Sequence, residues 1–159
     1  GRFKSLLISS DGEKYSPEGI EEALVEKSPY IDQVMLYNNQ CTTTTALIVP
    51  NRDSLRRYLK EKGMKAESVE GRTAALQLIE NELARFKKGG EFQGMFPERW
   101  LPSSFAVLAE PFTEQNQMIN STMKMVRPKI EKAYKERIDY IYTSEGKATL
   151  NQQNIDSIF

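Results

Sequence analysis

Short apolar runs separated by polar turns predict a strand and then a helix at the start of the chain. Residues 3–9 form an apolar run typical of a strand, and the Ser-Asp-Gly sequence behind it is typical of a tight turn. Ser16, Pro17 and Glu18 then favour a helix start, and apolar residues follow at helical spacing. Ser28 precedes a proline, which disfavours helical backbone angles, so we expect the helix to end there.

The middle of the chain carries the pattern of a β-sheet. Residues 34–37 and 42–49 are rich in apolar and β-branched side chains, and Asn38 and Asn39 stand between them. This pattern predicts two strands joined as a hairpin. Apolar and polar residues alternate again over residues 104–109, which predicts a third strand.

Three further helices are predicted where apolar residues return at helical spacing. They cover residues 53–62, residues 72–88 and a stretch that starts at Pro128. Gly63 is expected to end the first of them and a Gly-Gly pair the second, because glycine readily adopts the left-handed conformation that follows many helices. The narrow apolar stripe of the second helix favours ordinary core packing over a partner-binding seam.

These elements predict an α+β domain with a small mixed β-sheet, flanking helices and an N-terminal β-hairpin. We expect the domain to cover residues 1–142, and the weak pattern of residues 143–159 predicts a C-terminal tail. At 159 residues the chain is long enough to bury a core without disulfides or metals.

Composition excludes several classes of function. Lysine plus arginine and aspartate plus glutamate both count 22, so bulk charge favours neither nucleic acid nor an anionic membrane. The chain has no histidine, which rules out a Ser-His-Asp triad and a His-ligated zinc site within it. A single cysteine, Cys41, and the lack of a long apolar run favour a cytoplasmic protein without a transmembrane segment, although a peripheral membrane contact stays open.

Lys124 is one candidate for chemistry. It lies between a polar loop and the start of the last predicted helix, where an ammonium group and unpaired backbone N–H groups would both attract an anion. An ordinary solvated lysine is the alternative. The same region is basic, with Lys124, Arg127, Lys129, Lys132, Lys135 and Arg137. Acidic residues interrupt this series, which favours a solvated helix face and no nucleic-acid partner.

Two stretches near opposite ends of the chain resemble adenylate-forming enzymes. The start, GRFKSLLISSDGEKYSPEGIEEAL, is similar to the hinge motif of long-chain acyl-CoA synthetases: Gly-Arg-x-Lys, a short apolar run, Ser-Asn/Asp-Gly-Glu, then Pro and Ile-Glu. The stretch FPERWLPSSFAVLAEPFTEQNQMINSTMKMVRPKIEKAY resembles the closing part of the same branch, where Phe-Thr, a polar loop and Thr-hydrophobic-Lys precede a basic helix. Their joint occurrence in this order makes the resemblance specific.

The resemblance implies that the chain is the mobile C-terminal domain of an AMP-forming acyl-CoA synthetase. Its partner would be a large N-terminal adenylation domain of the same polypeptide, which binds ATP, Mg²⁺ and a carboxylic acid, expected to be a medium- or long-chain fatty acid. CoA would accept the acyl group. No metal site is expected in this chain, and the chain alone is expected to be inactive, because the phosphate loop and the acyl pocket would belong to the other domain.

Individual residues take roles from the same resemblance. Lys124 would be the adenylation lysine, Lys4 the hinge and Arg2 a nucleotide contact. The loop that enters the active site for thioester formation and flanks the pantetheine channel would consist of Ser10, Asp11, Gly12, Glu13 and Lys14. The chain departs from the common pattern at Ser5, where an aspartate usually follows the hinge lysine, and at Met123, where many relatives have glycine.

Two alternatives remain open. The first is a free-standing, non-catalytic binding module that shares the fold and uses its basic last helix for a protein or nucleic-acid partner. The second is an acyl-AMP ligase that delivers the acyl group to a carrier protein. A parent reading frame that extends several hundred residues upstream of Gly1 is expected for the enzyme and not for the binding module.

Overall fold

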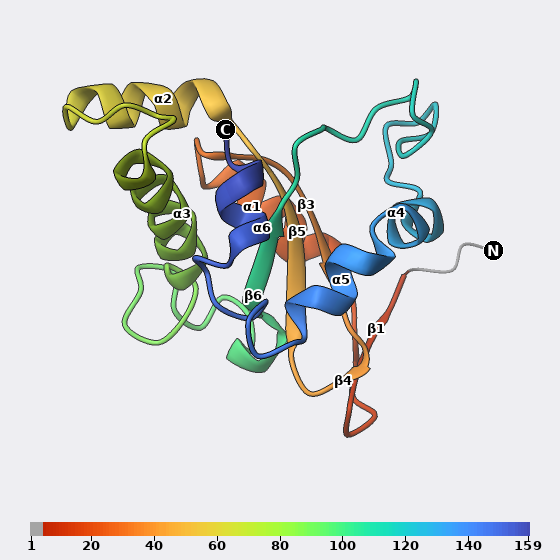
Figure 1. Ribbon diagram of the computed structural model, residues 1–159. Coiled ribbons are helices and arrows are strands. Elements are labelled where there is room, and N and C mark those ends of the chain that lie inside the picture. Colours follow the sequence, from red (N-terminus) through yellow and green to blue (C-terminus); the bar gives the residue numbers. More distant parts are fainter. Residues whose placement is uncertain (1–4) are drawn as a thin grey trace.

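The computed structural model describes residues 5–159 as strands and helices arranged in layers (Figure 1). The strands are β1 (Leu7–Ser9), β2 (Lys14–Tyr15), β3 (Ile31–Tyr37), β4 (Asn39–Cys41), β5 (Thr44–Pro50) and β6 (Pro102–Val107). The helices are α1 (Glu18–Glu26), α2 (Arg52–Glu61), α3 (Val69–Ala84), α4 (Arg127–Ala133), α5 (Lys135–Ile141) and α6 (Gln152–Ser157), with a short 3-10 helix η1 (Glu98–Trp100).

The main sheet has the strand order β3-β5-β6 and is mixed, as predicted. β5 lies in the centre, antiparallel to β3 with Met35 opposite Leu47, and parallel to β6 with Ala46 opposite Phe105. All residues of β5 are buried, because helices cover both faces of the sheet. A second sheet has the order β2-β1-β4, and the antiparallel pair of β1 and β2 is the predicted N-terminal hairpin.

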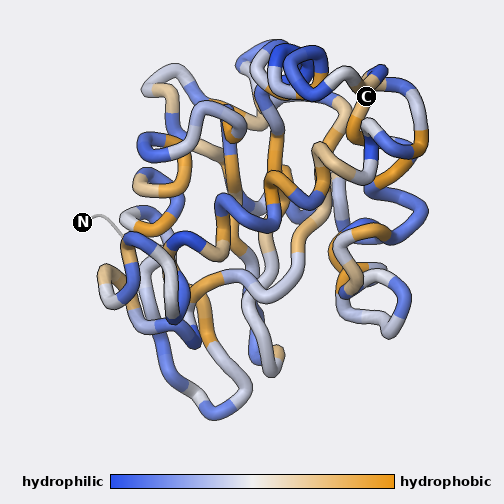
Figure 2. Tube along the Cα trace, turned by 90° about the vertical axis from the view of Figure 1, so that its left-hand side faces the viewer, coloured by the Kyte–Doolittle hydropathy of each residue, from blue (hydrophilic) through white to orange (hydrophobic). Residues whose placement is uncertain are grey.

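Two hydrophobic cores fill the space on the two faces of the main sheet. Successive residues of β5 point to opposite faces, so Ile48 belongs to the first core and Leu47 to the second. α1, α2 and α3 pack their apolar residues into the first core, while α4 and α5 pack into the second. Figure 2 shows the hydrophobic positions gathered along the central segments and the hydrophilic ones in the outer turns.

The connection between β3 and β5 differs from the predicted two-residue turn at Asn38 and Asn39. It contains β4, which pairs in parallel with β1, and the Asn38 side chain accepts a hydrogen bond of 2.8 Å from the Cys41 N–H inside it. The pairing partner of β4 lies about thirty positions away in the chain, and local sequence patterns do not encode such pairings.

Two predicted helices have different bounds in the structure. α3 begins after Ser68, whose hydroxyl caps the N–H of Gly71 at 2.9 Å, and it ends at Ala84, before the Gly-Gly pair. Just beyond this end Phe86 is buried and packs against Phe92, with ring centroids 5.1 Å apart. The predicted last helix is divided at Tyr134, where φ is −112°, into α4 and α5.

Residues 143–159, whose weak pattern predicts a tail, pack onto the main sheet and include α6. Asn154 is fully buried, accepts a 3.0 Å hydrogen bond from the Val107 N–H and donates one of 3.0 Å to the Phe105 carbonyl. Ile158 is fully buried in the first core. This segment carries buried polar residues, so a search for apolar periodicity does not detect it.

Candidate functional site

Lys124 lies in a small hairpin that precedes α4. Ile119 and Met125 form an antiparallel bridge at the base of this hairpin. Asn120 ties the turn together, because its side-chain oxygen accepts 3.0 Å hydrogen bonds from the N–H groups of Thr122 and Lys124. We call residues 118–126 the Lys124 hairpin. Its internal hydrogen bonds give it a defined shape even though much of it is exposed.

Met123 has the backbone conformation that glycine adopts most easily. Its φ is +64° and its side chain is 70% exposed. A left-handed conformation is uncommon for residues with a Cβ. The position at which the resemblance leads us to expect glycine therefore has a glycine-like backbone in this chain, with Met123 in its place.

The ammonium group of Lys124 is available for a ligand. The residue is exposed, and none of the ion pairs within residues 5–159 includes it. The structure therefore presents Lys124 on a braced turn with its charge directed to solvent. Its role in adenylation remains a prediction.

A buried ion pair lies at the base of the Lys124 hairpin. Arg127, the first residue of α4, donates hydrogen bonds from both terminal guanidinium nitrogens to the carboxylate of Glu21 in α1, one of them at 2.9 Å. The side chains are only 12% and 6% exposed. Burial raises the pKa of Glu21, and the hydrogen bonds from Arg127 act against that rise. In the sequence Arg127 looks like part of a basic, solvated helix face, and no local signal pairs it with Glu21.

The loop predicted to serve thioester formation is the turn between β1 and β2. Gly12 has φ of +89°, and a Cβ built on it would have nothing within 4 Å. Asp11 accepts hydrogen bonds from the Ser9 hydroxyl and, at 3.1 Å, from the Glu13 N–H, and these bonds lower the pKa of Asp11. The backbone of Ser10 bonds to the carbonyl of Cys41 at 3.0 Å, and Lys14 opens β2 with an exposed side chain.

A second segment of the chain supports this turn. Arg99 in η1 forms a bidentate ion pair with Glu13, with both N···O distances at 2.7 Å, and this pair lowers the pKa of Glu13. The neighbouring Trp100 stacks on Tyr15 with ring centroids 5.3 Å apart and ring planes 7° from parallel. This stretch contributes to the family resemblance, but no local sequence signal indicates a role for Arg99 or Trp100.

The structure does not bring the two predicted loops together. In Figure 1 the turn between β1 and β2 lies at the bottom of the molecule, and the segment before α4 that includes Lys124 lies at the top right. One orientation of this domain can therefore present only one of the two loops to a single external site. Arg2 and Lys4, the predicted nucleotide contact and hinge, lie outside the described residues.

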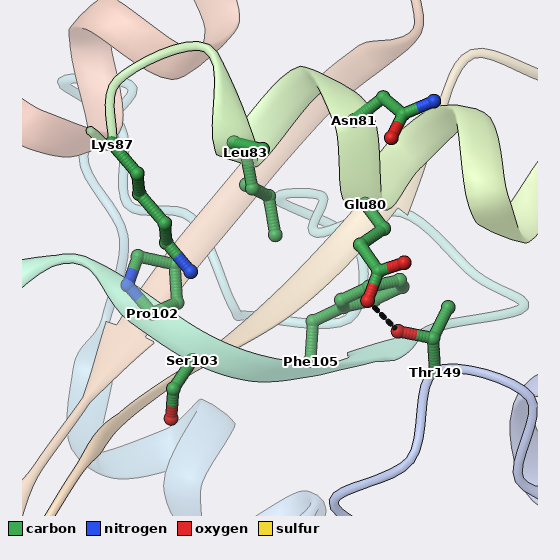
Figure 3. Close-up of a pocket in the computed structure, with 9 residues that line it drawn as sticks. Glu80, Asn81, Leu83, Lys87, Pro102, Ser103, Phe105 and Thr149 are labelled. Carbon is green, nitrogen blue, oxygen red and sulfur yellow. Dashed lines mark hydrogen bonds between the residues drawn. The ribbon is translucent and has the colours of Figure 1, made fainter. Parts of the chain in front are cut away.

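A separate cavity of about 300 Å³ lies between α3 and β6 (Figure 3). The hydroxyl of Thr149 donates a 2.6 Å hydrogen bond to Glu80 on its wall, and burial lowers the pKa of Lys87 at its other end. None of the predicted site residues lines it.

Within residues 5–159 no group of three or more His, Cys, Asp or Glu residues is placed to hold a metal ion, and no helix is long and apolar enough to cross a membrane.

Comparisons with known proteins agree with this fold. Residues 4–82 match the family described as the AMP-binding enzyme C-terminal domain. The adenylation domain of a carboxylate reductase from Mycobacterium chelonae superposes with a TM-score of 0.68 at 29% identity, covering 86% of this chain and 19% of that one. The adenylation and carrier-protein didomain of a carboxylic acid reductase from Segniliparus rugosus, solved with AMP, shares the fold with a TM-score of 0.62 at 24% identity, covering 91% of this chain and 18% of that one.

Three curated relatives extend the comparison. Two of them are from Arabidopsis thaliana, and both are 27% identical to this chain. The match to a chloroplastic long-chain-fatty-acid acyl-carrier-protein ligase covers 90% of this chain, and the match to long chain acyl-CoA synthetase 8 covers 89%. The carboxylic acid reductase of Mycobacterium tuberculosis is 28% identical over 95% of it. The chain spans 17%, 19% and 12% of these three relatives.

The small mixed sheet, the N-terminal hairpin and the structural neighbours define a C-terminal domain of the adenylating, AMP-forming ligase class. The chain belongs to the family of AMP-binding enzyme C-terminal domains, and its relatives include long-chain acyl-CoA synthetases.

Proposed function

We propose that this chain is the mobile C-terminal domain of an AMP-forming ligase that activates a medium- or long-chain fatty acid. An N-terminal adenylation domain of the same polypeptide would bind ATP, Mg²⁺ and the acid. A carboxylate oxygen would attack the α-phosphorus and release pyrophosphate, and a thiol would then take the acyl group from the acyl adenylate and release AMP. Family membership and relatives that act on fatty acids support this proposal.

The single observation that carries the proposal is the presentation of Lys124. Attack of a carboxylate on a phosphate brings two anions together, and a cation placed between them offsets their repulsion without transferring a proton. Lys124 offers an exposed ammonium group that forms no ion pair with any carboxylate among residues 5–159, and it lies on a turn that Asn120 braces. This chemistry needs no histidine, which agrees with a chain that has none.

The turn around Gly12 would serve the second half-reaction. A narrow pantetheine arm can pass close to a backbone only where no side chain projects, and Gly12 leaves open space where a Cβ would stand. The segment before α4, which includes Lys124, and the turn between β1 and β2, which includes Gly12, lie far apart in the domain (Figure 1). A rotation of the domain between the two half-reactions would allow each loop to act in turn.

CoA is the acceptor that we favour, and a carrier protein is the second candidate. The second candidate has support of its own, because one relative is named for ligation of a fatty acid to acyl-carrier protein. A nucleic-acid-binding module has less support. Arg127 and Arg137 turn inward to Glu21 and to the Val107 carbonyl, and Lys135 pairs with Asp139 at 2.8 Å.

The decisive experiment is ATP–pyrophosphate exchange by the full-length protein with a panel of carboxylic acids of different chain length. Exchange that depends on a fatty acid is the expected result. Acyl transfer from the preformed adenylate is then compared for CoA and for a carrier protein with its pantetheine arm. The absence of exchange with every acid would contradict the proposed function, and transfer to the carrier protein alone would replace CoA as the acceptor.

A further inference from the structure

Glu21 joins three elements at the outer edge of β3. The residue is 5% exposed. Its Oε2 atom accepts a 2.7 Å hydrogen bond from the Leu36 N–H in β3 and one of 2.9 Å from Arg127 in α4, while Glu21 itself belongs to α1. β3 is an edge strand of the main sheet, so the carboxylate meets an N–H group that no neighbouring strand engages.

The pair of Glu21 and Arg127 connects helices that lie on opposite faces of the sheet. Ile20, next to Glu21, packs into the first core, and Ile130, in the same helix as Arg127, packs into the second. The ion pair therefore crosses the edge of the sheet between the two layers. Bidentate hydrogen bonds between a guanidinium and a carboxylate fix direction as well as distance.

The Lys124 hairpin behaves as a unit whose orientation is set at its base. The bridge between Ile119 and Met125, the 2.8 Å bond from the Val126 N–H to the Met118 carbonyl and the side chain of Asn120 hold it together internally. Arg127 follows this unit directly. A small rotation at Arg127 would therefore move the whole hairpin, including the ammonium group.

A second contact with β3 lies at Phe112, at the start of the segment that leads to the Lys124 hairpin. The amide of Gln33 in β3 donates a 3.0 Å hydrogen bond to the carbonyl of Phe112 and accepts one of 2.8 Å from its N–H. The chain from Phe112 to Arg127 is thus attached to β3 at its start through Gln33 and at its end through Glu21. The charged attachment is the one next to Lys124.

We propose that Glu21 and Arg127 are positioning residues that hold Lys124 in its orientation for adenylation. The inference rests on the proposed function, in which Lys124 meets the reacting carboxylate and phosphate. Displacing a catalytic group by about 1 Å can cost roughly a hundredfold in rate. The Gly12 turn has its own support from Arg99, so loosening of the ion pair is expected to leave thioester formation unaffected.

The test uses Arg127→Gln and Arg127→Lys in the full-length enzyme, with Lys132→Gln as the matched control. Lys132 is exposed in the same helix, and its replacement changes the charge by the same amount. We expect Arg127→Gln to lower kcat for pyrophosphate exchange roughly tenfold or more, with acyl transfer from preformed adenylate within about twofold of the parent enzyme. Arg127→Lys keeps the charge but not the bidentate geometry, and an intermediate loss of exchange is expected.

Hydrogen–deuterium exchange provides a measurement that does not depend on activity. Amides of residues 118–126 are expected to exchange faster in both Arg127 variants than in the parent, while those of β5 keep their protection. Unchanged hydrogen–deuterium exchange of residues 118–126 in the Arg127 variants would overturn the inference. Equal losses of rate in adenylation and in acyl transfer would overturn it as well.

A reference variant, Lys124→Ala, separates the two proposals. A selective loss of adenylation in Lys124→Ala, combined with a normal Arg127→Gln enzyme, would reject the positioning role alone. Normal adenylation in Lys124→Ala would remove Lys124 from the chemistry and reject the positioning role with it, whereas the proposed ligase function fails only if the parent enzyme shows no exchange with any acid. If Arg127→Gln fails to fold, Arg127→Lys carries the same comparison.

Discussion

Arg99 and Glu13, which are 86 residues apart in the chain, form two parallel hydrogen bonds of 2.7 Å between guanidinium and carboxylate. This ion pair connects η1 to the turn that contains Gly12. The Arg99 side chain is 63% exposed, so the ion pair contributes little to the free energy of unfolding. Its two parallel hydrogen bonds fix the position of the turn relative to η1.

The ion pair leads us to expect that the turn is sensitive to acid. Hydrogen bonds from Arg99 lower the pKa of Glu13 below its ordinary value of 4.5, and the bonds from Ser9 and Glu13 lower that of Asp11. A carboxylate with a lowered pKa stabilises the folded form above its unfolded pKa, and this contribution is lost as the pH falls through the folded value. We therefore expect the turn to loosen below about pH 4.5.

Carbon-detected NMR titration of the 159-residue chain tests this prediction. Arg99→Gln is expected to move the titration midpoint of Glu13 up toward 4.5 and to shift the fluorescence of Trp100. Arg56→Gln serves as the control, because Arg56 forms a comparable exposed pair with Glu67 elsewhere. An unchanged midpoint in Arg99→Gln would show that Arg99 does not hold the Glu13 carboxylate in solution.

Gly12 and Gly63 provide a matched pair for the thioester loop. Both have a left-handed backbone, with φ of +89° and +73°, and neither has an atom within 4 Å of the place where a Cβ would stand. Leucine at either position is therefore expected to lower the free energy of unfolding by about 1 kcal/mol through backbone strain. We expect only Gly12→Leu to slow acyl transfer from preformed adenylate in the full-length enzyme. Equal transfer rates in the two variants would remove Gly12 from the pantetheine path.

Lys124→Ala probes the first half-reaction. Removal of one preorganised cation from developing charge costs on the order of 10²–10³ in rate. Pyrophosphate exchange should fall by that amount, whereas transfer of the acyl group from supplied acyl adenylate should continue. Lys132→Ala, in an exposed position of α4, is the control. A parallel decline of both half-reactions would point to a structural role for Lys124.

Asn154 tests the contribution of residues 143–159 to stability. Its side chain bonds to Val107, Phe105 and Thr149 in a fully buried position. Asn154→Leu leaves several buried backbone groups without partners and is expected to cost on the order of 3 kcal/mol in the free energy of unfolding. Urea denaturation measures this loss against Gln152→Ala, an exposed change in the same helix. A loss of similar size in both variants would contradict the buried role of Asn154.

The sequence by itself determined the elements whose signals are local. The buried run of β5 and the antiparallel pairing of β3 with β5 follow from apolar periodicity. The start of α1 lies where Pro17 and Glu18 predict it, but Ser16 does not cap it: Pro17 is the N-cap residue, and the Ser16 hydroxyl donates a 2.6 Å hydrogen bond to the Glu18 side chain. The resemblance of residues 1–24 and 96–134 indicated the family and predicted Lys124 as the adenylation lysine.

Only the tertiary structure decided which distant residues meet. Glu21 with Arg127 and Glu13 with Arg99 look like ordinary solvated charges in the sequence, and Asn154 looks like part of a polar tail. The partners in each of these contacts are far apart in the sequence, so no periodic pattern of apolar residues reveals them. Charge pairing and buried polar hydrogen bonds depend instead on how the layers pack. The separation of the segment before α4 from the turn between β1 and β2 (Figure 1) has the same origin, because the packing of the layers and not the local sequence places these two segments.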